Sequence, residues 1–209
     1  MKHIAVLVSG GGTNLQALID AQGRGEIVNG SITAVISSSP DAYALERAKQ
    51  AGIPGYVIDR RDYPSNRAMT AALVDKLHQL DIQLVVLAGF MTILTEEMVR
   101  AFPNAILNIH PALIPSFAGP GCYGLHVHEK ALAYGVKLSG ATVHFVSPEC
   151  DGGPIVLQKA VEVLPDDTPE VLQRRIMEKC EWKLLPQAVS LFCQDRLSVE
   201  GRTVRILDK

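Results

Sequence analysis

Short apolar segments alternate with longer amphipathic segments along the first half of the chain. The apolar segments are rich in β-branched residues and are followed by glycine or polar residues, which predicts buried strands. We expect these strands at residues 4–8, 32–36, 56–58, 82–90 and 104–110. The intervening segments repeat apolar residues every three or four positions and predict helices at residues 14–25, 42–51, 65–80 and 96–102. Strands joined through helices run parallel, so this half predicts a parallel sheet with helices on both faces.

The pattern changes after Pro120. A helix is expected at residues 125–134, and it is followed by SGATVHFV and PIVLQKAVEV, two strands close enough to pair antiparallel. A long helix should begin after Thr168 as N-cap, with an inward stripe and a kink at Pro186. The stripe consists of Leu172, Ile176, Cys180, Leu184 and Ala188. The last segment, LSVEGRTVRIL, predicts a terminal hairpin.

Composition narrows the class of protein. The chain has 209 residues, 47% hydrophobic and 20% charged, which favours a single α/β domain over residues 1–209. A formal net charge of −2 gives no general attraction to nucleic acid or anionic membranes, so neither is expected as a partner. No apolar run reaches the roughly 18 residues of a membrane helix, and the first segment is too short for a signal peptide. The four cysteines form no C-x-x-C pair, which predicts free thiols in a cytoplasmic protein and no metal site.

The segment VSGGGTNLQALI places three glycines between the first strand and the first helix. It does not fit a dinucleotide fingerprint, because Leu15 stands where that motif needs a small residue and the next strand ends in serines. Backbone N–H groups at a helix start instead suit a single phosphate, at Gly12, Thr13 and Asn14. A plain glycine-rich connection is the alternative.

Candidate catalytic residues lie at the end of the strand ILNIH. Asn108 and His110 are two positions apart on this strand, so they share a face, and the carboxyl ends of strands carry the ligands in open α/β sheets. Alone, they are also compatible with a turn cap and a buried structural histidine. Asp151, in the segment ECDGGPI, adds a carboxylate that can orient His110 and raise its pKa by holding its charged form. An amide, an imidazole and a carboxylate suit direct transfer of a group between two nucleophiles, because no serine or cysteine is placed to form a covalent intermediate.

Four segments together resemble one family. SGGGTNLQALI, VVLAGFMTIL, LNIHPALIPSF and GATVHFVSPECDGGPIVLQ are similar, in this order, to the phosphoribosylglycinamide formyltransferases. The resemblance implies a Rossmann-like formyltransferase fold: a mostly parallel twisted sheet flanked by helices, with an antiparallel C-terminal portion. It implies transfer of a formyl group from 10-formyltetrahydrofolate, the co-substrate, to the amine of 5'-phosphoribosylglycinamide in purine biosynthesis, without a metal. Two small-molecule substrates are therefore the expected partners of a monomer or homodimer.

The resemblance also implies roles for named residues. Asn108, His110 and Asp151 match the catalytic trio, and Gly12, Thr13 and Asn14 match the binders of the substrate phosphate. Glu181 matches a carboxylate near the substrate ribose, across a one-residue length difference. The lining of the family's folate pocket is matched by a strip, by Asn108 and by a facing loop at residues 147–151. The strip consists of Met91, Thr92, Ile93 and Leu94. The phosphate-binding half is expected at residues 1–103, and the folate-binding and catalytic half at residues 104–209.

Some positions depart from the family. Thr92 stands where many members have an arginine, and either Asn66 or Arg67 aligns with an arginine beside the folate. The loop 117–128 is longer than in some relatives. We expect His128 to be a solvated residue at a helix start, while His144 fits a core position and a site neighbour equally well.

Three other functions remain open at this stage. Formyltetrahydrofolate deformylases resemble the same Asn, His and Asp set but carry an extra N-terminal domain, whereas this chain begins at its first strand. Methionyl-tRNA formyltransferases usually have alanine at the position of Pro111 and an extra C-terminal domain. From a different class, a non-catalytic nucleotide-binding module would keep the fold, and loss of a trio residue would have favoured it.

Overall fold

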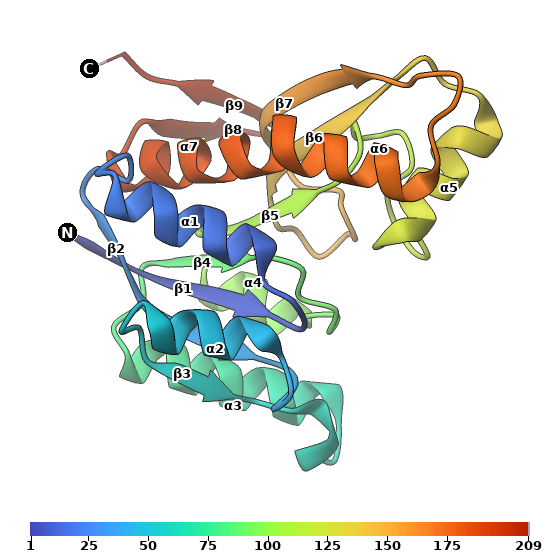
Figure 1. Ribbon diagram of the computed structural model, residues 1–209. Helices are drawn as coiled ribbons and strands as arrows, with labels where there is room; N and C mark the ends of the chain where they lie inside the picture. Colours follow the sequence, from blue (N-terminus) through green and yellow to red (C-terminus); the bar gives the residue numbers. More distant parts are fainter. Residues whose placement is uncertain (209) are drawn as a thin grey trace.

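One twisted sheet runs through residues 1–208, which the computed structural model describes, in the strand order β3-β2-β1-β4-β5-β6-β7-β9-β8 (Figure 1). Its strands are β1 (Lys2–Val8), β2 (Gly30–Ser37), β3 (Gly55–Val57), β4 (Leu84–Leu87), β5 (Ile106–His110), β6 (Leu138–Phe145), β7 (Ile155–Glu162), β8 (Leu197–Glu200) and β9 (Thr203–Ile206). Strands β1 to β5 pair parallel, and β6 pairs antiparallel with both β5 and β7. The mostly parallel sheet with an antiparallel C-terminal portion is confirmed.

Helices cover both faces of this sheet. They are α1 (Thr13–Gly23), α2 (Tyr43–Gln50), α3 (Asn66–Gln79), α4 (Glu96–Ala101), α5 (Leu125–Tyr134), α6 (Pro169–Ile176) and α7 (Trp182–Cys193), with a 3₁₀ turn η1 (Arg60–Asp62) and a π-turn η2 (Met177–Glu181). Helices α1, α2, α6 and α7 contribute to one apolar cluster, and α3 and α4 to the other. The long helix predicted after Thr168 is therefore three segments, with Thr168 as the predicted N-cap.

The kink predicted at Pro186 stays a prediction. Helix α7 continues through Pro186, and an irregular turn, η2, directly precedes α7. A proline removes the hydrogen bond to the carbonyl four residues earlier, and helices adjust to such a loss on the N-terminal side. The predicted stripe is nevertheless buried from Leu172 to Ala188.

The strand order reverses at the carboxyl ends of β1 and β4. The chain leaves β1 towards β2 and β3 on one side, then returns to place β4 and β5 on the other side. In open α/β sheets ligands bind at such a switch point. The glycine turn after β1, the strip after β4 and the polar residues of β5 all lie at this edge.

The terminal hairpin is also confirmed. Strands β8 and β9 pair antiparallel, and β9 joins the sheet beside β7. Within residues 1–208, no helix has both the length and the apolar composition that crossing a membrane requires.

Candidate active site

The glycine turn begins helix α1 with an unusual backbone at Gly12. This residue is left-handed, with φ 72° and ψ 36°, and a Cβ atom there would lie 2.7 Å from the Cβ of Ala44. Both the conformation and the space require glycine. The first helical bond runs from the N–H of Gln16 to the carbonyl of Gly12, so the N–H groups of Thr13 and Asn14 have no partner within the helix. The turn therefore offers donors at the positive end of a helix dipole.

Glu181 lies against this turn. Its carboxylate accepts a 2.6 Å hydrogen bond from the Asn14 Nδ2 amide, and both side chains are buried. Burial raises the pKa of Glu181 to about 7, although the bond from Asn14 acts in the opposite direction. The Oδ1 atom of Asn14 has no protein partner in the described chain. Residues far apart in sequence thus form one buried polar pair beside the expected phosphate position.

The strip Met91–Leu94 follows β4 and is held from both sides. The Met91 N–H donates to Ser9 Oγ at 2.8 Å, and the Asn66 amide donates to the Ile93 carbonyl at 2.7 Å. Arg67 instead pairs with Glu97, with 3.0 Å between Nε and Oε1. Of the two candidates for the family's arginine position, Asn66 is the one that contacts the strip.

Asn108 is oriented by His144, which lies opposite it on β6. The Nδ1 of His144 lies 2.9 Å from the Phe145 carbonyl oxygen, an acceptor, so Nδ1 carries the proton in the neutral ring. Nε2 is then an acceptor, and Asn108 Nδ2 donates to it at 3.1 Å. His144 is therefore a site neighbour, a role that its alternation with Thr142 in the sequence left open.

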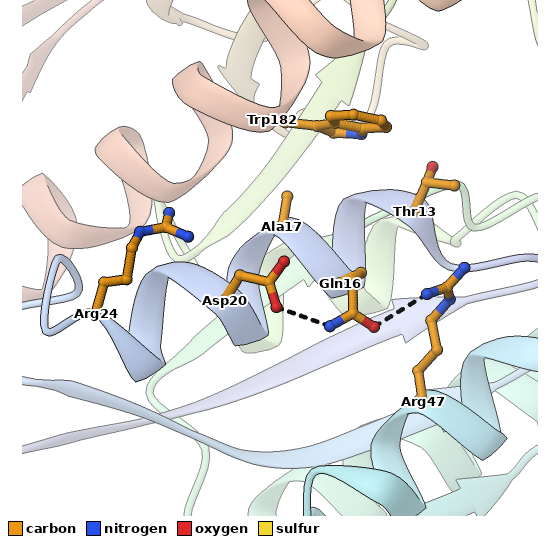
Figure 2. A pocket seen from close by; sticks show the side chains of 7 residues that line it. All are labelled: Thr13, Gln16, Ala17, Asp20, Arg24, Arg47 and Trp182. Carbon is orange, nitrogen blue, oxygen red and sulfur yellow. Dashed lines mark hydrogen bonds between the residues drawn. The ribbon is translucent and has the colours of Figure 1, made fainter.

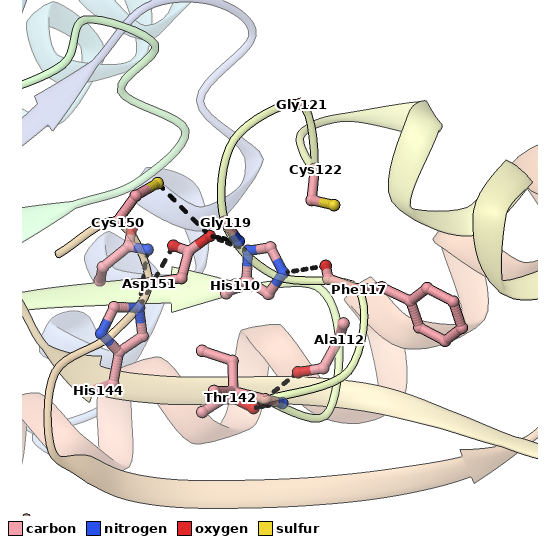
Figure 3. Close-up of polar contacts among 12 residues, drawn as sticks. His110, Ala112, Phe117, Gly119, Gly121, Cys122, Thr142, His144, Cys150 and Asp151 are labelled. Atoms are coloured by element: carbon pink, nitrogen blue, oxygen red, sulfur yellow. Dashed lines mark hydrogen bonds and ion pairs between the residues drawn. The ribbon is translucent and has the colours of Figure 1, made fainter.

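His110 lies between two acceptors (Figure 3). Its Nδ1 is 3.5 Å from Asp151 Oδ2, and its Nε2 is 2.8 Å from the Phe117 carbonyl oxygen. Burial lowers the pKa of His110, and the Asp151 charge and the Phe117 carbonyl only partly oppose this shift. Asp151 raises the pKa of His110, as expected, but burial lowers it more, because His110 is only 4% exposed and loses more hydration than Asp151 replaces.

Asp151 stays ionised although it is largely buried. Burial raises its pKa, but the charge of His110 and the hydrogen bond donated by the Gly119 N–H act against that effect, and the net shift is downward. The Gly119 N–H donates to Asp151 Oδ2 at 2.9 Å (Figure 3). A Cβ on nearby Gly153 would collide with the Phe145 carbonyl, so glycine is needed for the loop to fold this closely. The structure thus brings Asn108, His110 and Asp151 together, with His144 between the amide and the carboxylate.

The prediction that His128 is solvated is wrong. Its side chain is fully buried in α5, and neither ring nitrogen has a protein partner in the described part of the chain. Burial, with a smaller contribution from the charge of His110, lowers its pKa to about 4. His126 is the exposed member of the pair and contacts Glu129 at 2.8 Å. The apolar positions of α5 indicate that one face of the helix is buried. The pattern does not show whether His126 or His128 lies on that face.

No group of three or more His, Cys, Asp or Glu side chains in residues 1–208 is arranged to hold a metal ion. The cysteines at positions 122, 150, 180 and 193 are free thiols. Cys150 adjoins Asp151, with 3.9 Å between Sγ and Oδ2, and burial raises its pKa.

Residues 2–189 match the family model described as formyl transferase. The chain belongs to the formyl transferase family. Within this family it is similar to the phosphoribosylglycinamide formyltransferase of Haemophilus influenzae, at 44% identity over 96% of this chain and 91% of that protein. The crystal structure of glycinamide ribonucleotide transformylase 1 from Symbiobacterium toebii superposes with a TM-score of 0.94 and 49% identity, over 100% of this chain and 95% of that one.

A protein named for a different activity is also similar. The structure of a formyltetrahydrofolate deformylase from Pseudomonas syringae superposes with a TM-score of 0.86 at 28% identity. The match covers 99% of this chain but 66% of that one. The fold of this chain is therefore shared by a glycinamide ribonucleotide transformylase and by a formyltetrahydrofolate deformylase.

Proposed function

We propose that the chain transfers the formyl group of 10-formyltetrahydrofolate to the amine of 5'-phosphoribosylglycinamide, a step of purine (IMP) biosynthesis. The products are the formylglycinamide ribonucleotide and tetrahydrofolate. One observation carries the proposal: the glycine turn, the strip and the polar trio lie at the same edge of the sheet, in a chain that matches formyltransferases of this name over nearly its whole length.

The two substrates bind side by side at this edge of the sheet. The phosphate of the ribonucleotide binds at Gly12, Thr13 and Asn14, where free N–H groups meet the helix dipole. Glu181 accepts a hydrogen bond from a ribose hydroxyl. The folate lies along Met91–Leu94, beside Asn108, on a strip whose Met91 and Ile93 side chains are 55% and 79% exposed. Residues 1–103 thus supply the phosphate site, and residues 104–209 supply the catalytic groups of one domain.

The trio acts on the formyl carbon. When the amine attacks, the formyl oxygen becomes negatively charged, and two donors face it. Asn108 has a second amide hydrogen that His144 does not use, and His110 donates from Nε2 once the oxyanion takes the place of the Phe117 carbonyl. Each such donor typically stabilises a transition state by about 3 kcal/mol.

Completion of the transfer moves one proton. The bond between the formyl carbon and the folate nitrogen breaks as the adduct collapses, so the attacking amine must lose a proton and the leaving nitrogen must gain one. The ionised Asp151 accepts the first proton through water, and the paired His110 and Asp151 return one to the leaving nitrogen. No covalent bond to the protein forms.

Deformylation is the second candidate, since a deformylase shares the fold. In that reaction water replaces the amine, and the phosphate turn has no ligand to bind. One assay separates the two: the protein is given 10-formyltetrahydrofolate with and without the ribonucleotide, and loss of the formyl group is followed. Turnover that requires the ribonucleotide supports the transferase. Equal turnover without it indicates a hydrolase, and no turnover in either case indicates a binding module.

A further inference from the structure

Helix α2 holds the glycine turn from behind. The Ala44 N–H donates to the Gly10 carbonyl at 3.1 Å, and Arg47 Nε donates to the Gly11 carbonyl at 2.8 Å. These bonds direct two carbonyl oxygens of the turn to α2. Carbonyl oxygens repel an anion, so fixing them on α2 leaves the N–H groups at the start of α1 to face it.

The Arg47 guanidinium carries a charge that no acid neutralises. Its Nη1 donates to Gln16 Oε1 at 3.0 Å, and its face lies over the Tyr43 ring, 5.0 Å from the centroid. No carboxylate in the described chain lies within 4.0 Å of it, and its Nη2 has no hydrogen-bond partner there. Arg24, by contrast, donates to Glu26 through both Nε and Nη2. A half-buried, oriented arginine without a counter-ion points to an anionic ligand.

The Arg47 side chain lines a pocket beside the glycine turn (Figure 2). The pocket has a volume of about 300 Å³ and is lined by Thr13, Gln16, Ala17, Asp20, Arg24, Arg47 and Trp182. Arg47 and Thr13 lie at the same end, and the Trp182 ring forms the opposite wall. A phosphate bound to the N–H of Thr13 is therefore accessible to Arg47 from this pocket.

We propose that Arg47 is a further binding residue for the substrate phosphate, and that it also positions the turn through Gly11. The inference rests on the proposed function, because it assigns the anion to the phosphate of the ribonucleotide. Gln16 fixes the guanidinium so that Nη2 and the positive charge face the dianion. The turn supplies backbone donors, and Arg47 supplies the charge that these neutral donors lack.

The test compares two substrates that differ only in the phosphate. Arg47→Met and Arg47→Lys are assayed with the ribonucleotide and with its dephosphorylated ribonucleoside. Arg47→Met should raise the KM for the ribonucleotide about 10- to 100-fold, the range of a charge-assisted bond. Its KM for the ribonucleoside and for the folate, and its kcat, should change less than about threefold. The KM of Arg47→Lys for the ribonucleotide should lie between those of the parent and Arg47→Met, because lysine keeps the charge but loses the bond to Gly11.

Arg24→Met is the matched control, since Arg24 lines the same pocket but is already paired with Glu26. It should leave all of these constants within about twofold of the parent. An equal loss on both substrates in Arg47→Met, or no loss on either, would overturn the proposal. The first result would mean that Arg47 only supports the turn, and circular dichroism of the variants checks that they fold.

Binding measured without turnover separates this proposal from the proposed function. Trp182 is the only tryptophan of the chain and lines the pocket, so its fluorescence follows titration with the ribonucleotide. If the wild-type protein binds the ribonucleotide but transfers no formyl group, the proposed function fails. The role of Arg47 is then still supported if Arg47→Met binds the ribonucleotide more weakly than the wild-type protein does. If Arg47→Met binds as tightly as the parent, the proposal for Arg47 fails whatever the activity.

Discussion

Asn14 and Glu181 are 167 positions apart, yet the amide of one donates to the carboxylate of the other at 2.6 Å, joining the start of α1 to the π-turn η2. Because Glu181 is buried, its pKa rises from 4.5 to about 7. An acid whose pKa is raised by folding binds its proton more tightly in the folded chain. Folding stability therefore falls as the pH rises between these two values.

Glu181→Gln should remove this pH dependence. The amide keeps the shape of the side chain and carries no charge, so the variant should gain stability relative to the parent between about pH 5 and pH 8. Urea unfolding at both pH values measures the difference. Glu178→Gln, at an exposed position in the same turn, is the control. A constant difference between Glu181→Gln and the parent would contradict the assignment.

Asp151→Asn should lower kcat at least about 100-fold, because the amide keeps the shape but can neither accept the amine proton nor stabilise charged His110. Both KM values should stay within about threefold of the parent, since neither substrate depends chiefly on this carboxylate. Steady-state kinetics across a range of pH values measures both effects. Asp75→Asn, exposed on α3, is the control. Near-parental turnover with an unchanged pH profile would mean that the trio is structural.

Gly12→Ala should weaken ribonucleotide binding and lower stability, because the new Cβ meets Ala44 and the backbone is left-handed. Such a residue costs about 1 to 2 kcal/mol before any clash is counted. Gly11→Ala is the matched control, since it has open space and no positive φ, and it should cost less than about 0.5 kcal/mol. Titration with each substrate should show that folate binding is nearly intact in Gly12→Ala. Equal loss of both affinities would indicate a structural hinge.

His128→Leu should make the chain more resistant to acid. The pKa of this buried histidine falls from 6.5 to about 4 on folding, so the parent loses stability as the pH falls between these values. The free energy of unfolding of the parent should fall by roughly 3 kcal/mol over this range. The variant should not show this decrease. Thermal unfolding at about pH 7 and pH 4.5 compares the two, with the exposed His126→Leu as control. An identical acid sensitivity in parent and His128→Leu would show that this ring is not the group concerned.

The parts of the fold that follow from local pattern were predictable from the sequence. The period of apolar residues predicted the strands and helices, and Thr168 followed by Pro169 marked a helix start. The position of Asn108 and His110 at the end of a strand predicted their place at the carboxyl edge of the sheet. These features depend on residues close together in the chain. The contact of Asp151 with His110 also followed, because its loop ends a strand of the same sheet.

Features that depend on packing between distant segments were not predictable. The residues next to His128 in the sequence do not show that its side chain is buried in α5. The residues next to Asn66 do not show that Asn66, and not Arg67, contacts the Ile93 carbonyl. The net pKa of His110 likewise depends on how completely the loop after β5 covers it, and sequence proximity to a carboxylate does not reveal that.

The π-turn η2 explains how the stripe from Leu172 to Ala188 keeps one orientation. A regular α-helix rotates about 100° per residue, so apolar positions spaced by four advance about 40° at each step and about 160° over four steps. Such a stripe would wind halfway around the helix and leave one end in water. A π-turn accommodates about one extra residue in a turn, so it removes about one residue's rotation, roughly 100°, and cancels most of that drift. The strict spacing of four between the apolar positions is therefore what a helix interrupted by η2 requires. The same turn places Glu181 on the side of the helix that faces Asn14.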